Sequence, residues 1–160
     1  MSTLKKVLAQ KIEAHRPRTQ KLVKEHGAKK IGEVTIAQAI GGARGIRSLG
    51  TDISYLDPQE GIRFRGKTIP ETFAALKAHV VPGCEMPTVE SFFYFLLTGD
   101  VPSKEQAGEV AADWKSREQV PAYVYDVLRA LPRDTHPMTM FSAAILSMQR
   151  DSAFARRYGE

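Results

Sequence analysis

The chain has 160 residues, enough for one domain, and its content of 42% hydrophobic and 8% aromatic residues excludes an intrinsically disordered protein. Its net charge of +5 is unevenly distributed, because residues 1–67 hold 14 Lys and Arg against 6 Asp and Glu, whereas residues 68–160 hold 9 against 12. The basic first part favours an anionic partner, such as nucleic acid, an acidic surface or a phosphorylated small molecule.

Cysteine content and hydrophobic runs indicate the compartment. Cys84 is the only cysteine, which excludes an intrachain disulfide and favours a reducing compartment. No apolar run approaches the roughly 18 residues that span a bilayer. The amino terminus has no signal-peptide core, and its lysines together with Glu13 and Glu25 are not typical of a transit peptide. We therefore expect a cytoplasmic protein with no membrane partner, although a processed organellar protein would show a similar pattern.

The first 40 residues predict two helical regions. Thr3 can cap an amphipathic helix, which Pro17 is expected to break or restart before Gly27 ends it. The apolar stripe of this helix is thin and lacks aromatics, which favours packing against the rest of the protein over a membrane or nucleic acid. A short extended segment then leads to Thr35, which suits the cap of a helix through Ile40.

Residues 54–66 predict a β-hairpin. Asp57 and Pro58 suit the first positions of a type I turn, and Gly61 can take the left-handed position that closes it. Apolar residues alternate with polar ones on both arms, which predicts one face packed on the protein; they are Ile53 and Tyr55 before the turn and Ile62 and Phe64 after it. The opposite face would carry Arg63, Arg65 and Lys67 as a solvated edge that discourages strand addition.

Helices are predicted for the remainder of the chain. The aromatic run at 92–97 would suit a strand, but a start at Thr88 and a stop at Gly99 favour a helix. Apolar side chains on all its sides predict the most deeply buried helix of the chain. The other helices are expected to begin near Thr68, Ser103, Pro121, Pro137 and Ser152.

Few residues suggest catalysis or metal binding. The four histidines, His15, His26, His79 and His136, lack the spacing to another His, Cys or carboxylate that a metal site requires. His136 precedes Pro137 and is expected to satisfy a helix start rather than to act as a base. No Ser, Cys or carboxylate arrangement indicates a nucleophile or an acid–base pair, so we predict no catalytic residue and no metal ligand in this chain.

The segment 41–47 is the most informative for function. Its glycines would let backbone N–H groups approach an anion closely, and Arg44 and Arg47 could pair with that anion. Arginine presents a planar fork that matches phosphate oxygens. The segment is compatible with phosphate binding and also with a plain exposed loop.

Several of these motifs occur together in one family. Residues 56–66, with the loop 41–45, resemble the amino-terminal part of citrate synthase, nearest to the branch that includes the mitochondrial enzymes. The resemblance extends from about Leu4 to the last residue. Further matches follow in order: Leu97-Thr98-Gly99, Val101-Pro102, His136-Pro137-Met138, Ser142-Ala143-Ala144 and Phe154-Ala155-Arg156.

The resemblance implies a mainly α fold with one short β-hairpin, in which residues 1–160 form an incomplete, amino-terminal part of the large helical domain. It implies an acyltransferase that condenses acetyl-CoA with oxaloacetate to citrate and CoA in the tricarboxylic acid cycle. Such an enzyme is a homodimer that needs no metal or bound cofactor, and acetyl-CoA is its substrate. The helix from Pro137, which could otherwise be an ordinary core helix, would lie at the subunit interface.

The resemblance also implies where binding and chemistry occur. Arg44 matches the arginine that contacts coenzyme A phosphates in the family, and it is the one binding residue predicted. The family's catalytic His and Asp residues, and its small domain, correspond to positions after Glu160. The 160 residues alone are therefore expected to be inactive.

Two other functions remain compatible with the sequence. A 2-methylcitrate synthase-type acyltransferase would differ in residues that this chain does not contain. A non-catalytic basic module could instead bind nucleic acid or another polyanion through residues 1–67. That module would lack interleaved aromatics and a single charged helix face, so no nucleic-acid partner is predicted.

Overall fold

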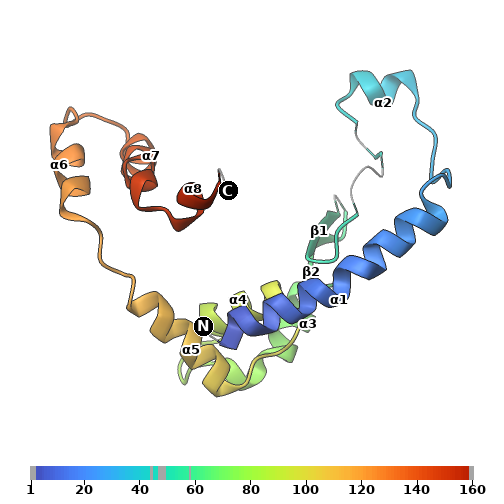
Figure 1. Cartoon of the computed structure of the whole chain (residues 1–160), viewed down its shortest axis with the longest axis horizontal. Helices are drawn as coiled ribbons and strands as arrows, with labels where there is room; N and C mark the ends of the chain where they lie inside the picture. Colours follow the sequence, from blue (N-terminus) through green and yellow to red (C-terminus); the bar gives the residue numbers. More distant parts are fainter. Residues whose placement is uncertain (1–2, 44, 47–49, 58, 159–160) are drawn as a thin grey trace. The chain divides into compact units, whose positions relative to one another are not determined.

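The computed structural model describes residues 3–43, 45–46, 50–57 and 59–158, which form helices and one two-stranded antiparallel sheet (Figure 1). Arg44, Arg47 and Pro58 lie outside the described residues. The chain divides into two compact units, Met1–Trp114 and Lys115–Glu160. The predicted mainly α class with one short hairpin is confirmed.

The first helix, α1 (Thr3–His26), continues through Pro17, so the predicted break at this residue is wrong. Proline removes one backbone hydrogen bond, at a cost of about 3 kcal/mol, but the helix on each side keeps its own bonds. Contacts with other segments also hold its first half. The Thr3 amide and hydroxyl both donate to the Glu109 carboxylate, at 3.2 and 3.0 Å, and Lys11 Nζ lies 2.6 Å from Asp100 Oδ2.

Two short helices begin at capping boxes, the local motif in which a threonine and a residue three positions later bond reciprocally. Thr35 and Gln38 start α2 (Ile36–Ile40), and Thr68 and Glu71 start α3 (Ile69–Ala75). Leu76 follows α3 and is fully buried, and the short 3₁₀ helix η1 (Lys77–His79) comes next. The predicted helix starts at Thr35 and Thr68 are confirmed.

The hairpin consists of β1 (Ser54–Asp57) and β2 (Gly61–Phe64). Gly61 has a φ of 90°, as predicted for the residue that closes the turn. Tyr55 pairs with Arg63, whereas Leu56 pairs with Ile62. Residues opposite each other on antiparallel strands project to the same face. Leu56 therefore shares the face of Ile62, and the predicted grouping of Tyr55 with Ile62 is wrong.

A second tight turn follows β2 directly. Phe64 and Lys67 exchange two backbone hydrogen bonds of 2.8 and 2.9 Å, and the two residues between them have positive φ, 50° at Arg65 and 80° at Gly66. These features define a type I′ turn. The turn redirects Arg65 away from the strand edge, so the predicted solvated edge does not include it. A type I′ turn usually carries Asn-Gly or Asp-Gly, which is why the pattern Arg-Gly did not indicate one.

The hydrophobic core of the first unit surrounds α4 (Val89–Thr98), as predicted. Tyr94 and Phe95 are 2% and 1% exposed, and Ser91 and Thr98 are also buried. Gly99 ends the helix with a φ of 79°, and its amide donates to the Phe95 carbonyl at 2.7 Å. Edge-to-face contacts join α4 to β2 through Phe92 and Phe64, and to α5 (Lys104–Lys115) through Phe93 and Trp114.

The second unit contains α6 (Ala122–Ala130), α7 (Pro137–Ser147), the 3₁₀ helix η2 (Met148–Asp151) and α8 (Ala153–Arg157). Val124 of α6 is 1% exposed, and the Tyr123 hydroxyl donates to Asp151 Oδ2 at 2.6 Å. No residue of α7 is buried. Its exposed apolar side chains are Met138, Phe141, Ile145 and Leu146.

Candidate functional site

The glycine-rich loop after α2 has a left-handed backbone on both sides of Arg44. Gly42, Ala43 and Gly45 have φ values of 77°, 62° and 74°. A side chain at Gly42 would meet open space, so the backbone conformation, not crowding, is what favours glycine there. A non-glycine residue such as Ala43 in this region stores about 1 kcal/mol or more of strain, which is typical of functional loops.

Two backbone hydrogen bonds shape this loop. The Ala43 amide donates to the Gln38 carbonyl at 2.8 Å, and the Ile46 amide donates to the Ala43 carbonyl at 3.1 Å. The loop faces a cavity of about 320 Å³ lined by residues 31–34 with Gly45 and Ile46. Arg44, the predicted binding residue, lies outside the described residues, and its role stays a prediction. The surrounding backbone has the tight, left-handed turns that let a loop approach an anion.

The segment that follows this loop is held by Arg65, whose side chain is only 16% exposed. Its Nε and one terminal nitrogen donate to the carbonyls of Leu96 and Leu97 at 2.8 and 2.6 Å. The other terminal nitrogen donates to the Asp52 carbonyl at 3.4 Å and lies 3.7 Å from Asp52 Oδ1. Arg65 therefore joins the end of α4 to the end of the loop. The sequence offered no signal for this role, because its partners are 13 to 32 residues away.

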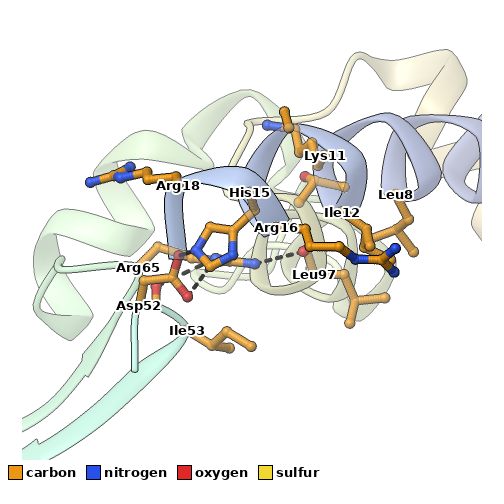
Figure 2. A pocket seen from close by; sticks show the side chains of 12 residues that line it. Leu8, Lys11, Ile12, His15, Arg16, Arg18, Asp52, Ile53, Arg65 and Leu97 are labelled. Atoms are coloured by element: carbon orange, nitrogen blue, oxygen red, sulfur yellow. Dashed lines mark hydrogen bonds and ion pairs between the residues drawn. The ribbon is translucent and has the colours of Figure 1, made fainter. Parts of the chain in front are cut away.

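A groove of about 540 Å³ lies beside Arg65 in the first unit, between α1 and the end of α4. Figure 2 shows His15 of α1, Asp52 and Arg65 pointing toward one another at its edge. His15 Nε2 lies 3.4 Å from Asp52 Oδ2, and both side chains are more than half exposed. An exposed pair of this kind contributes little to stability. At this edge Asp52 faces both His15 and Arg65, which is the pattern of a structural junction.

The other histidines have structural positions. His136 precedes α7, and its Nδ1 accepts a hydrogen bond from the Met138 amide at 3.2 Å, which confirms the predicted helix-start role. His79 is buried, and its Nε2 lies 2.9 Å from the Pro102 carbonyl. Within the described residues, no three His, Cys, Asp or Glu side chains are grouped as a metal site would require.

In the same part of the chain, no helix combines the length and apolar character needed to cross a bilayer.

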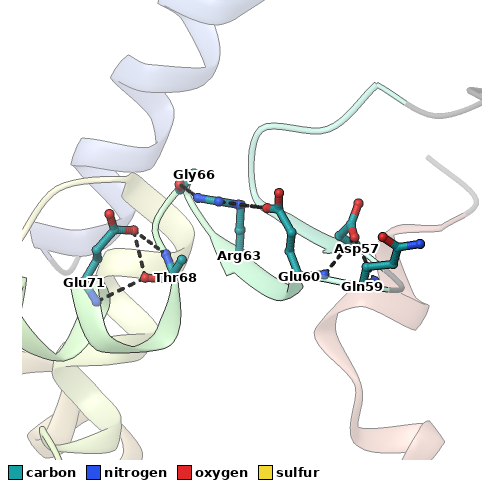
Figure 3. A network of polar contacts seen from close by, with 7 residues as sticks. All are labelled: Asp57, Gln59, Glu60, Arg63, Gly66, Thr68 and Glu71. Atoms are coloured by element: carbon teal, nitrogen blue, oxygen red, sulfur yellow. Dashed lines mark hydrogen bonds and ion pairs between the residues drawn. The ribbon is translucent and has the colours of Figure 1, made fainter.

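The hairpin turn is held by a network of polar contacts (Figure 3). Asp57 Oδ1 accepts hydrogen bonds from the amides of Glu60 and Gln59, at 2.9 and 2.8 Å. These bonds, together with the positive charge of Arg63, hold the pKa of the Asp57 carboxyl below its usual value of 3.8. Arg63 pairs with Glu60 at 2.9 Å and also donates to the Gly66 carbonyl, so its contacts stay within the hairpin.

The lowered pKa of Asp57 predicts an acid-sensitive hairpin. A depressed folded-state pKa stabilises the fold above the unfolded-state value, and this contribution is lost as the pH falls through the folded-state pKa. Between pH 5 and pH 2.5, we expect the denaturation midpoint of Asp57→Asn to fall less steeply than that of the unchanged protein. Asparagine keeps an acceptor for the two amides but cannot titrate. Parallel slopes for the two proteins would contradict this assignment.

Comparison with known proteins identifies the family. Residues 42–159 match the family model described as "Citrate synthase, C-terminal domain". The chain is 42% identical over 158 residues to "Citrate synthase, mitochondrial" of Aspergillus niger and 43% identical over 158 residues to that of Saccharomyces cerevisiae. It is 45% identical over 159 residues to "Probable citrate synthase, mitochondrial" of Glossina morsitans morsitans. These alignments cover 99% of this chain and 33–34% of each relative.

The chain belongs to the citrate synthase family. It spans about a third of the length of the curated citrate synthases it matches. The glycine-rich loop from Gly42 onward, the hairpin and the helices from α3 to α8 all fall within the region that matches the family model.

The expected cytoplasmic location is wrong, because the three citrate synthases compared above are all named as mitochondrial. A single cysteine and the lack of a signal-peptide core are equally compatible with the reducing mitochondrial matrix. The single cysteine therefore favours a reducing compartment without distinguishing the cytoplasm from the matrix.

Proposed function

We propose that the complete protein containing these residues is a mitochondrial citrate synthase. The reaction joins the methyl carbon of acetyl-CoA to the keto carbon of oxaloacetate, and water then releases citrate and CoA. The observation that carries this proposal is the 42–45% identity to named citrate synthases along nearly the entire chain. Identity at this level over every described element supports the same scaffold and the same ligands.

Within that enzyme, we assign the loop 41–51 to the nucleotide end of acetyl-CoA, and we call it the coenzyme A loop. Arg44 would pair with the phosphates, since a guanidinium offers two parallel donors to phosphate oxygens. The left-handed backbone at Gly42, Ala43 and Gly45 supports this assignment, because turns of this kind can present backbone N–H groups to an anion. Acetyl-CoA binds there as a substrate, and the proposal needs no metal or bound cofactor.

Oxaloacetate and the reacting carbon would be held by polypeptide other than these 160 residues. His15 lies beside Asp52 at an edge where both side chains are more than half exposed, and the buried His79 is bonded to a backbone carbonyl. We therefore propose that residues 1–160 supply part of the large helical domain and one side of the coenzyme A site.

A homodimer is the proposed assembly. The apolar side chains of α7 support it, since Met138, Phe141 and Leu146 are 62%, 61% and 73% exposed in the single chain. Clusters of exposed apolar residues mark protein interfaces. Ser142, Ala143 and Ala144 on the same helix are small enough for a second helix to approach closely.

An assay of thiol release tests the proposed function. The complete protein, given acetyl-CoA and oxaloacetate, is expected to release free CoA and to form citrate in equal amounts. The isolated 160 residues are expected to release none above the buffer rate. Turnover of propionyl-CoA in preference to acetyl-CoA would instead assign a 2-methylcitrate synthase. Absence of turnover with both donors would refute the proposal.

A further inference from the structure

Arg65 adopts a backbone conformation that is unusual for its residue type. Its φ of 50° places it in the left-handed region, where non-glycine residues are uncommon and cost of order 1 kcal/mol or more. The type I′ turn would be easier to form with asparagine or glycine at this position. A strained arginine in a tight turn indicates that its side chain makes contacts that offset the strain.

The first set of contacts lies at the carboxyl end of α4. The Leu96 and Leu97 carbonyls belong to the last turn of the helix, where carbonyls have no partner within the helix and carry partial negative charge. Arg65 donates to both, at 2.8 and 2.6 Å. Hydrogen bonds from a charged donor are about twice as strong as neutral ones. Because α4 is the most buried helix, Arg65 is fixed to the rigid core of the unit.

The second set of contacts lies at the end of the coenzyme A loop. Besides the side-chain contacts to Asp52, the Arg65 backbone amide donates to the Ile53 carbonyl at 2.7 Å. Residues 52–53 immediately follow the loop and precede β1. The start of the loop is fixed separately, by the α2 capping box and by the bond from the Gly41 amide to the Ala37 carbonyl at 2.9 Å. Arg65 thus supplies the anchor at the second end of the loop.

We propose that Arg65 is a positioning residue for acetyl-CoA binding. By joining the end of α4 to Asp52, it fixes the point at which the coenzyme A loop enters the hairpin, and acetyl-CoA binding by Arg44 depends on that fixed point. Arg65 itself does not contact the ligand. This inference rests on the proposed function and adds a residue whose contribution to acetyl-CoA binding passes through Arg44.

The test uses the complete protein and the variant Arg65→Asn. Asparagine tolerates positive φ, so the turn is kept while the guanidinium is removed. We expect the KM for acetyl-CoA to rise roughly three- to tenfold, a typical coupling between neighbouring groups. The kcat and the KM for oxaloacetate are expected to stay within about twofold of the unchanged protein, because the chemistry is remote from the loop. A general loss of structure would lower kcat as well.

The matched control is Arg63→Asn. Arg63 lies two residues earlier, on strand β2, and its contacts to Glu60 and Gly66 are local. The same substitution there removes the same charge and is expected to leave the KM for acetyl-CoA unchanged. An equal rise in both variants would show that net charge, not the bridge made by Arg65, determines binding, and would overturn the inference.

A double-mutant cycle with Arg44→Ala separates positioning from direct binding. If Arg65 acts through Arg44, Arg65→Asn should add no further rise in KM when Arg44 is already alanine. A full additional rise would overturn the inference. The inference would also be overturned if Arg44→Ala raises the KM for acetyl-CoA but Arg65→Asn leaves it unchanged. If Arg44→Ala has no effect, the proposed role of Arg44 fails first, and the positioning role fails with it.

A second variant keeps the test decisive if Arg65→Asn does not fold. Asp52→Asn leaves the bonds from Arg65 to α4 and to the Asp52 carbonyl in place, and it removes the carboxylate that faces both Arg65 and His15. We expect a rise of about twofold or more in the KM for acetyl-CoA alone. An unchanged KM in a folded Asp52→Asn protein would then overturn the inference.

Discussion

Replacing Arg44 by alanine in the complete protein is expected to raise the KM for acetyl-CoA roughly ten- to hundredfold, with kcat changed by less than about threefold. The expected size follows from the loss of about 1.5–3 kcal/mol in charge-assisted hydrogen bonds to phosphate. The effect falls on KM because the phosphates lie far from the carbon that reacts, so the same contacts exist before and during the reaction. Initial rates over a range of acetyl-CoA concentrations at saturating oxaloacetate measure both constants.

A surface arginine provides the control for Arg44→Ala. Arg129 of α6 pairs with Asp126 at 2.8 Å, and both side chains are about three-quarters exposed. Exposed pairs of this kind contribute little to stability, so Arg129→Ala should leave the rate constants unchanged. Raising the salt concentration should increase the KM of the unchanged protein and bring it closer to that of Arg44→Ala, because salt screens exposed charges. A KM for acetyl-CoA that is identical in Arg44→Ala and Arg129→Ala would remove Arg44 from the site.

Replacing Phe95 by alanine is expected to destabilise the protein by about 3–5 kcal/mol, the largest loss predicted for any single change here. Phe95 is 1% exposed in the middle of α4, so its truncation leaves a cavity that the surrounding helices cannot fill completely. The measurement is the shift of the denaturant midpoint, followed by circular dichroism in the complete protein.

Phe73 of α3 provides the comparison for Phe95. The two positions carry the same side chain in the same unit, but Phe73 is 38% exposed. Phe73→Ala should therefore cost about 1–2 kcal/mol, since part of its surface is already in contact with water. Equal losses at both positions would show that α4 is not the centre of the core. A smaller loss of stability from Phe95→Ala than from Phe73→Ala would contradict the deeper burial of Phe95.

Sequence alone was sufficient for the features that depend on neighbours a few residues apart. The capping boxes at Thr35, Thr68 and Ser103, the left-handed Gly61 and Gly99, and the helix start at His136 all use partners within four residues. Such features are visible in a short stretch because the hydrogen bonds that define them are local. The deep burial of α4 relative to the other helices was also predictable, because its run of apolar and aromatic residues favours the core.

Family membership was predictable for a related reason. The motifs from the glycine-rich loop to Phe154-Ala155-Arg156 occur in one order along the chain, and an ordered set is far more specific than any one of its members. Location was not predictable from the same residues, because the cysteine count and the lack of a signal-peptide core do not separate the cytoplasm from the mitochondrial matrix.

What the sequence by itself determined, then, was the family, the helical class and most helix boundaries, all of which depend on local bonds and on the order of motifs. Only the tertiary structure decided that α1 passes through Pro17, that Leu56 rather than Tyr55 shares a face with Ile62, and that Arg65 joins α4 to Asp52. The shared face of Leu56 and Ile62 depends on the strand register, and the role of Arg65 depends on contacts 13 to 32 residues away. The energy of such a contact is set by which segments meet in space, and no short stretch of residues encodes that.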